Sequence, residues 1–306
     1  MDKRLFADFI LLFVAFIWGA TFVLVQQALS FLDPFTFNAI RFTLAAIILS
    51  IWFLLFKREQ LQSLNRKFLV AGFFIGMSLF FGYALQTMGL LYTTSSKAGF
   101  ITGLSVVLVP LLAYFLLKQN LRPLAIIGSI IAVIGLFLLT VGDSISLNIG
   151  DLFVLGCAVA FAMHIVLIGK YTNEFPALLL TLGQIIGVAI ASSVSALVFE
   201  DWSLAFNIET LSEKDVLIAL LVTSILATAF AFLAQTKLQQ YTTPTRVALI
   251  FATEPVFAAI TAYFWADERL GYIPIVGCAL IFIGMILSEL KVKKLTIQTI
   301  SQKNPL

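Results

Sequence analysis

Long apolar stretches with very few charges recur along the whole chain and are separated by short polar connections. A helix that crosses a hydrocarbon core about 30 Å thick needs about 20 mostly apolar residues. We therefore expect ten membrane-spanning helices, at residues 6–29, 35–56, 68–91, 97–117, 122–141, 150–169, 176–198, 216–237, 244–266 and 272–290. A membrane β-barrel is not expected, because these apolar runs are continuous and too long for its alternating strands.

Composition points to the same class of protein. Of the 306 residues, 61% are apolar and 11% are charged, and the mean hydropathy is +1.05. Globular proteins have about 45–50% apolar and about 25% charged residues. This balance excludes an ordinary soluble enzyme, a disordered protein and a nucleic-acid binder. The two cysteines, Cys157 and Cys278, both lie in apolar runs and provide neither a disulfide framework nor a zinc site.

The positions of the basic residues predict the orientation in the membrane. With the N-terminus in the cytoplasm, fifteen Lys and Arg residues fall in cytoplasmic segments and only Lys97, Lys214 and Arg269 fall outside. Cytoplasmic connections carry the excess of basic residues in membrane proteins. We therefore expect an all-helical protein of the inner or plasma membrane with both termini in the cytoplasm and a basic cytoplasmic tail at 291–306.

The two halves of the chain resemble each other. A shift of 149 residues aligns 80–138 with 229–287 without a gap and gives 17 identities in 59 positions. Polar blocks match as well as apolar ones: Gln86-Thr87 falls on Gln235-Thr236, and Tyr92-Thr93-Thr94 falls on Tyr241-Thr242-Thr243. Shared membrane composition does not explain these polar matches. The sequence therefore predicts two repeats of five helices each, at residues 6–141 and 150–290.

An odd number of spans in each repeat inverts the second repeat in the membrane. Inverted repeats are the architecture of many secondary transporters, whose substrate site lies near the midplane between the halves. They also occur in channels, so a channel-like facilitator is the nearest alternative. An intramembrane enzyme is a second alternative, because His164 and Glu254 could act as an acid and base pair. No nucleophile or metal-binding motif accompanies these two residues.

Several short motifs resemble a known family. They are Trp18-Gly19 with Thr21-Phe22, Arg41-Phe42, the stretch from Ala84 through Gln86 and Tyr92-Thr93 to Pro110, Glu254-Pro255 through Ala259, Glu268-Arg269-Leu270, and Gly277 through Ile281. Together they resemble the drug/metabolite transporter superfamily, in a form with two EamA-type domains, over about residues 6–290. The resemblance implies a carrier that exports amino acids, other metabolites or toxic organic compounds. Gln119 departs from the family's frequent Glu, and Leu104-Ser105-Val106 lacks the Glu-Pro pair of the second half.

Ionisable residues within the spans are the first candidates for function. A charged side chain at the bilayer centre costs roughly 2.5–3.5 kcal/mol on insertion scales, so such residues are functional candidates by default. Glu254, near mid-membrane, is expected to bind substrate or a proton, or to form a structural hydrogen bond or ion pair. His164 lines a cavity or makes a helix-packing hydrogen bond. Arg41 binds substrate or anchors its helix by extending to the outer headgroups.

Uncharged residues complete the candidate pathway. Gln86 and Gln235 are related by the repeat and either line a cavity or join helices by hydrogen bonds. Trp18 and Tyr83 could stack on a flat or apolar substrate. Small residues on one face of two spans predict that these spans pack on each other or on a second copy of the chain: Gly128, Gly135, Gly277 and Gly284.

No sequence motif indicates a cofactor. The only Gly-Lys pair, Gly169-Lys170, lacks the upstream glycine of a phosphate-binding loop, and no zinc-protease or dinucleotide motif occurs. We therefore expect no cofactor and no metal, and an energy source in a gradient rather than in ATP hydrolysis. The sequence leaves open the identity of the substrate, the direction of transport and the coupling to protons.

Overall fold

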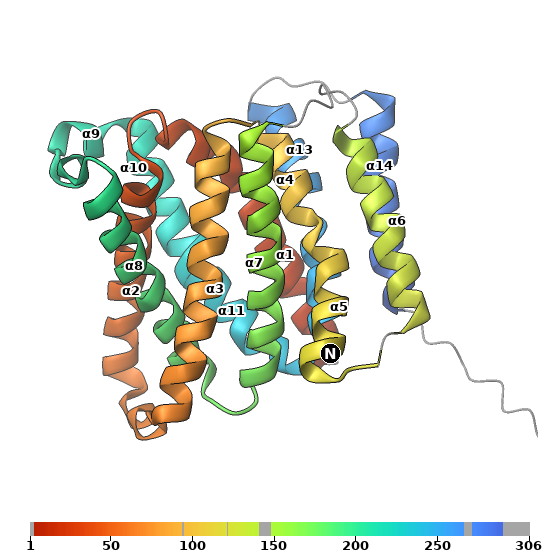
Figure 1. Cartoon of the computed structure of the whole chain (residues 1–306), viewed down its shortest axis with the longest axis horizontal. Coiled ribbons are helices and arrows are strands. Elements are labelled where there is room, and N and C mark those ends of the chain that lie inside the picture. The colour runs from red at the N-terminus through yellow and green to blue at the C-terminus, as the bar shows by residue number, and fades with distance from the viewer. Residues whose placement is uncertain (1–2, 94, 121, 141–147, 266–270, 290–306) are drawn as a thin grey trace, which may run out of the picture.

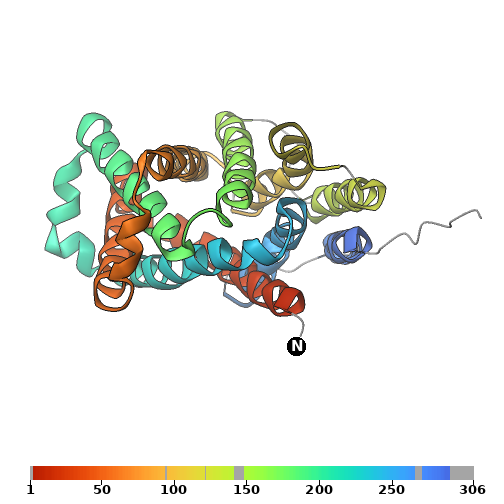
Figure 2. The same ribbon diagram turned by 90° about the horizontal axis from the view of Figure 1, so that it is seen from below.

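The computed structural model describes residues 3–93, 95–120, 122–140, 148–265 and 271–289. Within these ranges all regular structure is helical, and the long helices stand side by side, running between the bottom and the top of the bundle in the view of Figure 1. Figure 2 looks along the bundle from the end at which the chain starts. The predicted tail at 291–306 and the motif Glu268-Arg269-Leu270 lie outside the described residues.

The helices follow the predicted spans closely. The first half of the chain forms α1 (Lys3–Ala28), α2 (Pro34–Phe56), α3 (Arg66–Leu90), α4 (Ser95–Gly103), α5 (Ser105–Leu117) and α6 (Pro123–Thr140). The second half forms α7 (Ile149–Tyr171), α8 (Ala177–Phe199), α9 (Ile208–Ser212), α10 (Lys214–Val222), α11 (Ala231–Leu238), α12 (Pro244–Phe251), α13 (Glu254–Trp265) and α14 (Tyr272–Glu289). A π-helical segment, η3 (Thr223–Phe230), joins α10 to α11.

Among the described residues, seven helical segments are long and apolar enough to cross a membrane. Two of the seven are composite, because α4 continues into α5 and α10 continues through η3 into α11. The apolar parts of α6 and α14, Pro123–Leu138 and Ile275–Leu287, are shorter. The prediction of an all-helical membrane protein is therefore supported, whereas the number of ten spans stays a prediction.

Two predicted spans are not the continuous helices that we expected. The predicted span 97–117 is interrupted at Leu104, and the predicted span 244–266 is interrupted at Ala252 and Thr253. The second interruption has a clear cause. Pro255 has no backbone N–H to donate to the Phe251 carbonyl one turn earlier, so the first helix ends at Phe251.

The shift of 149 residues also relates the helix starts. α4, α5 and α6 start at positions 95, 105 and 123, and α12, α13 and α14 start at positions 244, 254 and 272. Each difference is 149, so the two interrupted spans are equivalent in the two halves. The helix boundaries given for the described residues thus follow the same shift as the sequence, and the internal repeat stays a prediction.

The glycine faces of α6 and α14 pack on each other at one edge of the bundle (Figure 1). A Cβ atom added at Gly135 would lie 2.6 Å from the carbonyl oxygen of Gly277, and one at Gly284 would lie 2.5 Å from that of Gly128. Only glycine permits an approach this close. Of the two predicted partners for this face, the structure shows the one within the chain.

Candidate substrate-binding cavity

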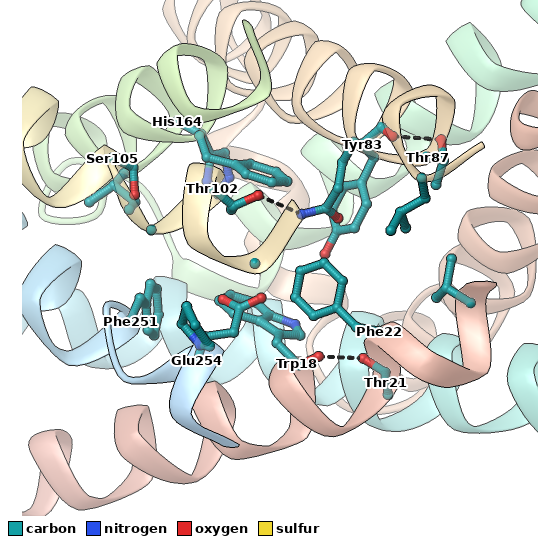
Figure 3. A pocket seen from close by; sticks show the side chains of 18 of the residues that line it. Trp18, Thr21, Phe22, Tyr83, Thr87, Thr102, Ser105, His164, Phe251 and Glu254 are labelled. Carbon is teal, nitrogen blue, oxygen red and sulfur yellow. Dashed lines mark hydrogen bonds between the residues drawn. The ribbon is translucent and has the colours of Figure 1, made fainter. Parts of the chain in front are cut away.

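A cavity of about 60 Å³ lies in the middle of the bundle (Figure 3). Helices α1 to α5 line it from the first half of the chain, and α7, α11, α12 and α13 line it from the second half. The structure brings together all seven residues that the sequence singled out: Trp18, Arg41, Tyr83, Gln86, His164, Gln235 and Glu254. A volume this small accommodates water or a small group, so a larger solute requires the helices around it to move apart.

Glu254 is the acidic group of the cavity. It is the first residue of α13, directly after the interruption, and its carboxyl group faces the cavity across from Thr102 and His164 (Figure 3). The predicted alternative was a structural ion pair or hydrogen bond. Among the described residues, the carboxyl group has neither kind of partner. Its oxygens are therefore available to a proton or to a ligand.

Close packing of α1 holds the start of α13 in place. A Cβ atom added at Gly19 would lie 2.9 Å from the backbone nitrogen of Ala258, and it would also overlap the Glu254 carbonyl oxygen. Gly19 thus lets α1 contact the backbone of α13 directly. Trp18, the preceding residue, lines the cavity and packs against the rings of Phe232 and Phe251 at centroid distances of 5.3 and 4.8 Å.

Arg41 is buried within the bundle, which favours the predicted role in the cavity over anchoring at the outer headgroups. Its side chain is 3% exposed and points into the cavity region of the bundle. The guanidinium group donates from Nε to Thr228 Oγ1 at 2.7 Å and lies 4.6 Å above the ring of Tyr83. Within the part of the chain that the structure describes, no carboxylate lies within 4.0 Å of it. A buried cation without an ion-pair partner requires another source of stabilisation.

The π-helical segment η3 accepts hydrogen bonds from two side chains of the cavity wall, Trp18 and Arg41. The indole Nε1 of Trp18 donates to the carbonyl oxygen of Ala227 at 2.8 Å, and Thr228 accepts from Arg41. In a π-helix the bonding pattern shifts by one residue, which changes the direction of backbone and side-chain groups, and such segments are frequent at functional sites. The segment therefore connects α1 and α2 across the cavity wall.

Gln86 and Gln235, which the shift of 149 residues aligns, both line the cavity. Gln86 donates from Nε2 to Thr102 Oγ1 at 3.3 Å. Gln235 is buried, and its Oε1 atom has no hydrogen-bond partner among the described residues. A buried amide oxygen without a partner costs about 1–3 kcal/mol. The unpaired oxygen at the cavity wall therefore favours a ligand-binding group over a bond between helices.

His164 has contacts that suit both of its predicted roles. It lines the cavity, and its Nε2 atom lies 2.6 Å from Oε1 of Gln184 on α8. Gln184 in turn donates from Nε2 to Thr236 Oγ1 at 3.2 Å, which leaves Oε1 as the acceptor for the histidine. The imidazole therefore donates from Nε2, and this bond joins α7 to α8. The ring also meets Phe232 edge to face at 5.8 Å.

Sequence reasoning missed a set of residues that also line the cavity. They are Thr21, Thr87, Thr102, Ser105, Phe22, Phe161, Phe232 and Phe251. The repeat contained a signal for one of them, because a shift of 149 residues places Ser105 on Glu254, which the sequence had singled out. Among the described residues, no group of three or more His, Cys, Asp and Glu side chains is placed to hold a metal ion.

Comparisons with known proteins identify similar transporter proteins. The model of the EamA-like transporter family matches residues 5–141 and 148–290. An uncharacterized transporter of Archaeoglobus fulgidus is 36% identical over 290 residues, which cover 95% of this chain and 88% of the relative. A chloroplastic WAT1-related protein of Arabidopsis thaliana is 26% identical over 89% of this chain and 66% of its own. One crystal structure matches with a TM-score of 0.75 and 19% identity over 92% of this chain and 96% of its own, which shows a shared fold.

Proposed function

The chain belongs to the EamA-like transporter family, and we propose that it is a secondary carrier that exports a small metabolite across the cell membrane by alternating access. One observation carries this proposal: both halves of the chain line the same central cavity. Its wall contains the acidic Glu254, the basic Arg41 and His164, and two amides that the repeat aligns, Gln86 and Gln235. Inverted repeats place substrate sites between their halves, and rocking of one half against the other opens the site to alternate sides.

The orientation in the membrane is part of the proposal. We place both termini in the cytoplasm because fifteen Lys and Arg residues fall on that side against three on the other. The end of the bundle at which α1 starts then faces the cytoplasm. One chain forms the whole cavity, and α14 covers the glycine face of α6, so a single chain is proposed as the transporting unit.

The substrate is proposed to carry an anionic group. Arg41 is a buried cation in the cavity wall with hydrogen bonds to uncharged partners only among the described residues. A carboxylate on the substrate would complete its ion pairing, because guanidinium and carboxylate groups match in geometry and charge. Around it, Trp18, Phe161, Phe232 and Phe251 offer apolar and aromatic surface for the rest of the solute.

The carrier and the channel-like alternative differ in one measurement. The purified chain is reconstituted into liposomes that hold a high concentration of unlabelled solute, and a panel of labelled amino acids and small organic acids is added outside. A carrier accumulates its labelled substrate transiently against the gradient of label, because inward movement of label is coupled to outward movement of unlabelled solute. A channel gives equilibration without accumulation, and that result would contradict the proposal.

Alanine at Gln86 or Gln235 tests the proposed site. Each variant removes one amide from the cavity wall, and loss of a hydrogen bond to a ligand raises the apparent KM by about 2- to 10-fold, for about 0.5–1.5 kcal/mol. Membrane abundance should be unchanged. Gln60, in the connection between α2 and α3, lies away from the cavity, and Gln60→Ala is the matched control. Normal KM in both cavity variants would show that these amides do not bind substrate.

A further inference from the structure

Two partly buried ion pairs join the halves of the chain at opposite ends of the bundle. Lys97, in the first turn of α4, contacts Asp151 in the first turn of α7, with 2.7 Å between Nζ and Oδ2. Arg246, in the first turn of α12, donates from Nε and Nη2 to the two carboxylate oxygens of Asp8 on α1, with 2.9 Å between Nε and Oδ1. In Figure 1, α1 starts at the bottom of the bundle, whereas α4 and α7 start at the top.

The repeat relates the two ion pairs to each other. A shift of 149 residues places Lys97 on Arg246. The shift that places Trp18 on Phe161, 143 residues, places Asp8 on Asp151. Each pair therefore joins the first helix of one half to the fourth span of the other half. Because the second half is proposed to be inverted, equivalent contacts lie on opposite sides of the membrane.

Both pairs are shielded from solvent, unlike the other ion pairs that the structure describes. The side chains of Lys97 and Asp151 are 16% and 1% exposed, and those of Arg246 and Asp8 are 12% and 15% exposed. Lys67 and Glu174, at the periphery, are 66% and 37% exposed. Exposed pairs contribute little to a conformational equilibrium, whereas loss of one partner from a buried pair has a much larger effect.

Each ion pair is connected to the cavity by a short helix. α4 runs from Lys97 to Gly99, Thr102 and Gly103 in the cavity wall and ends at the first interruption. α12 runs from Arg246 to Phe251 in the cavity wall and ends at the second interruption. A displacement of either helix away from its partner would open the cavity towards one side only, and the interruption would let the rest of the span stay in place.

We propose that Lys97–Asp151 and Arg246–Asp8 are the two gates of the carrier, one on each side of the cavity. Lys97–Asp151 restricts access from the outer side, and Arg246–Asp8 restricts access from the cytoplasmic side. Transport then requires the pairs to open alternately. This proposal rests on the proposed carrier function and adds to it the residues that control access.

Accessibility of the cavity from each side tests the gates directly. Val25 on α1 lines the cavity, and Val25→Cys in a background with Cys157→Ala and Cys278→Ala provides a thiol there. An impermeant thiol reagent is applied to right-side-out and to inside-out membrane vesicles. Lys97→Met should raise the labelling rate roughly tenfold from the outer side only, and Arg246→Met should raise it roughly tenfold from the cytoplasmic side only, a change of about 1.4 kcal/mol in the opening equilibrium.

Asp151 itself is a poor position for this test, because its carboxylate also accepts from the Asn148 backbone N–H and from Thr93 Oγ1. Substitution of the basic partners leaves this helix cap intact. Lys97→Arg and Arg246→Lys keep the charge and should label like the parent protein. Lys67→Met removes the exposed peripheral pair and is the matched control.

The outcomes separate the gates from the carrier function. Faster labelling from the outer side only in Lys97→Met, together with faster labelling from the cytoplasmic side only in Arg246→Met, supports the gates. If the labelling rate rises from the same side in both variants, or equals that of Lys67→Met, the two ion pairs are not gates. Labelling of Val25→Cys needs no substrate, so it tests the gates even if the protein shows no counterflow. Absence of counterflow in the parent protein would contradict the carrier function but not the gates.

Discussion

Glu254→Gln is expected to abolish transport driven by a proton gradient while the protein still folds and inserts. The carboxyl group faces the cavity and, among the described residues, has no ion-pair or hydrogen-bond partner. Glutamine keeps its shape and part of its hydrogen bonding but neither takes up nor releases a proton. In proteoliposomes subjected to a pH jump, flux through Glu254→Gln should fall to the level of protein-free liposomes. Exchange of substrate without a pH gradient should persist.

A matched control separates this effect from a general effect of removing an acid. Glu209 lies on the exposed short helix α9, outside the cavity, and Glu209→Gln should transport like the parent protein. Glu254→Asp keeps a titratable group about one bond shorter and should retain partial gradient-driven flux. If Glu254→Gln and the parent protein give equal flux at equal amounts of protein, Glu254 has no part in coupling.

The sequence predicted the helices well because the membrane imposes one rule on all of them. Lipid-exposed backbone groups must bond within a helix, so apolar length alone predicts each span. The same rule explains the error at 97–117 and 244–266. Helices may break where the backbone faces a cavity instead of lipid, and composition does not distinguish the two environments. Only Pro255, next to an acidic residue, indicated one of the two interruptions in advance.

The candidate site was predictable to a similar degree. Polar residues in an apolar span are costly, which singled out Arg41, His164 and Glu254, and the structure places all three at one cavity. The roles of these residues stay predictions. The sequence could not indicate that Arg41 lies against Thr228 and Tyr83, because those contacts join residues 187 and 42 positions apart. It likewise gave no reason to connect Asp8 with Arg246.

The close approach of helices was the least predictable feature. Gly19 and Gly72 are both glycines in apolar helices and look alike in the sequence. A Cβ atom at Gly19 would overlap the backbone of α13, whereas one at Gly72 would have no atom of another described element within 4 Å. The difference depends on which helix packs against each glycine, and this is a property of the whole fold. Small residues predict that a close contact exists but do not identify the partner.

Arg41→Met is expected to remove the preference of the carrier for an acid over the matching amide. The guanidinium group is buried at the cavity with only uncharged hydrogen-bond partners among the described residues, Thr228 and Tyr83. A hydrogen bond to a charged group contributes about 1.5–3 kcal/mol, so the parent protein should favour a carboxylate over its carboxamide by roughly 10- to 150-fold in kcat/KM. The measurement compares the two forms of whichever metabolite shows counterflow.

The comparison of two substrates distinguishes binding from support of the fold. If Arg41 only stabilises the packing of α2 against η3, Arg41→Met lowers transport of the acid and of the amide by the same factor. If it binds the anionic group, transport of the acid falls while transport of the amide is retained. Arg41→Lys keeps the charge without the planar fork and should retain part of the preference, because a lysine binds a carboxylate as a point charge. An equal loss for both substrates would contradict the proposed anionic class of substrate.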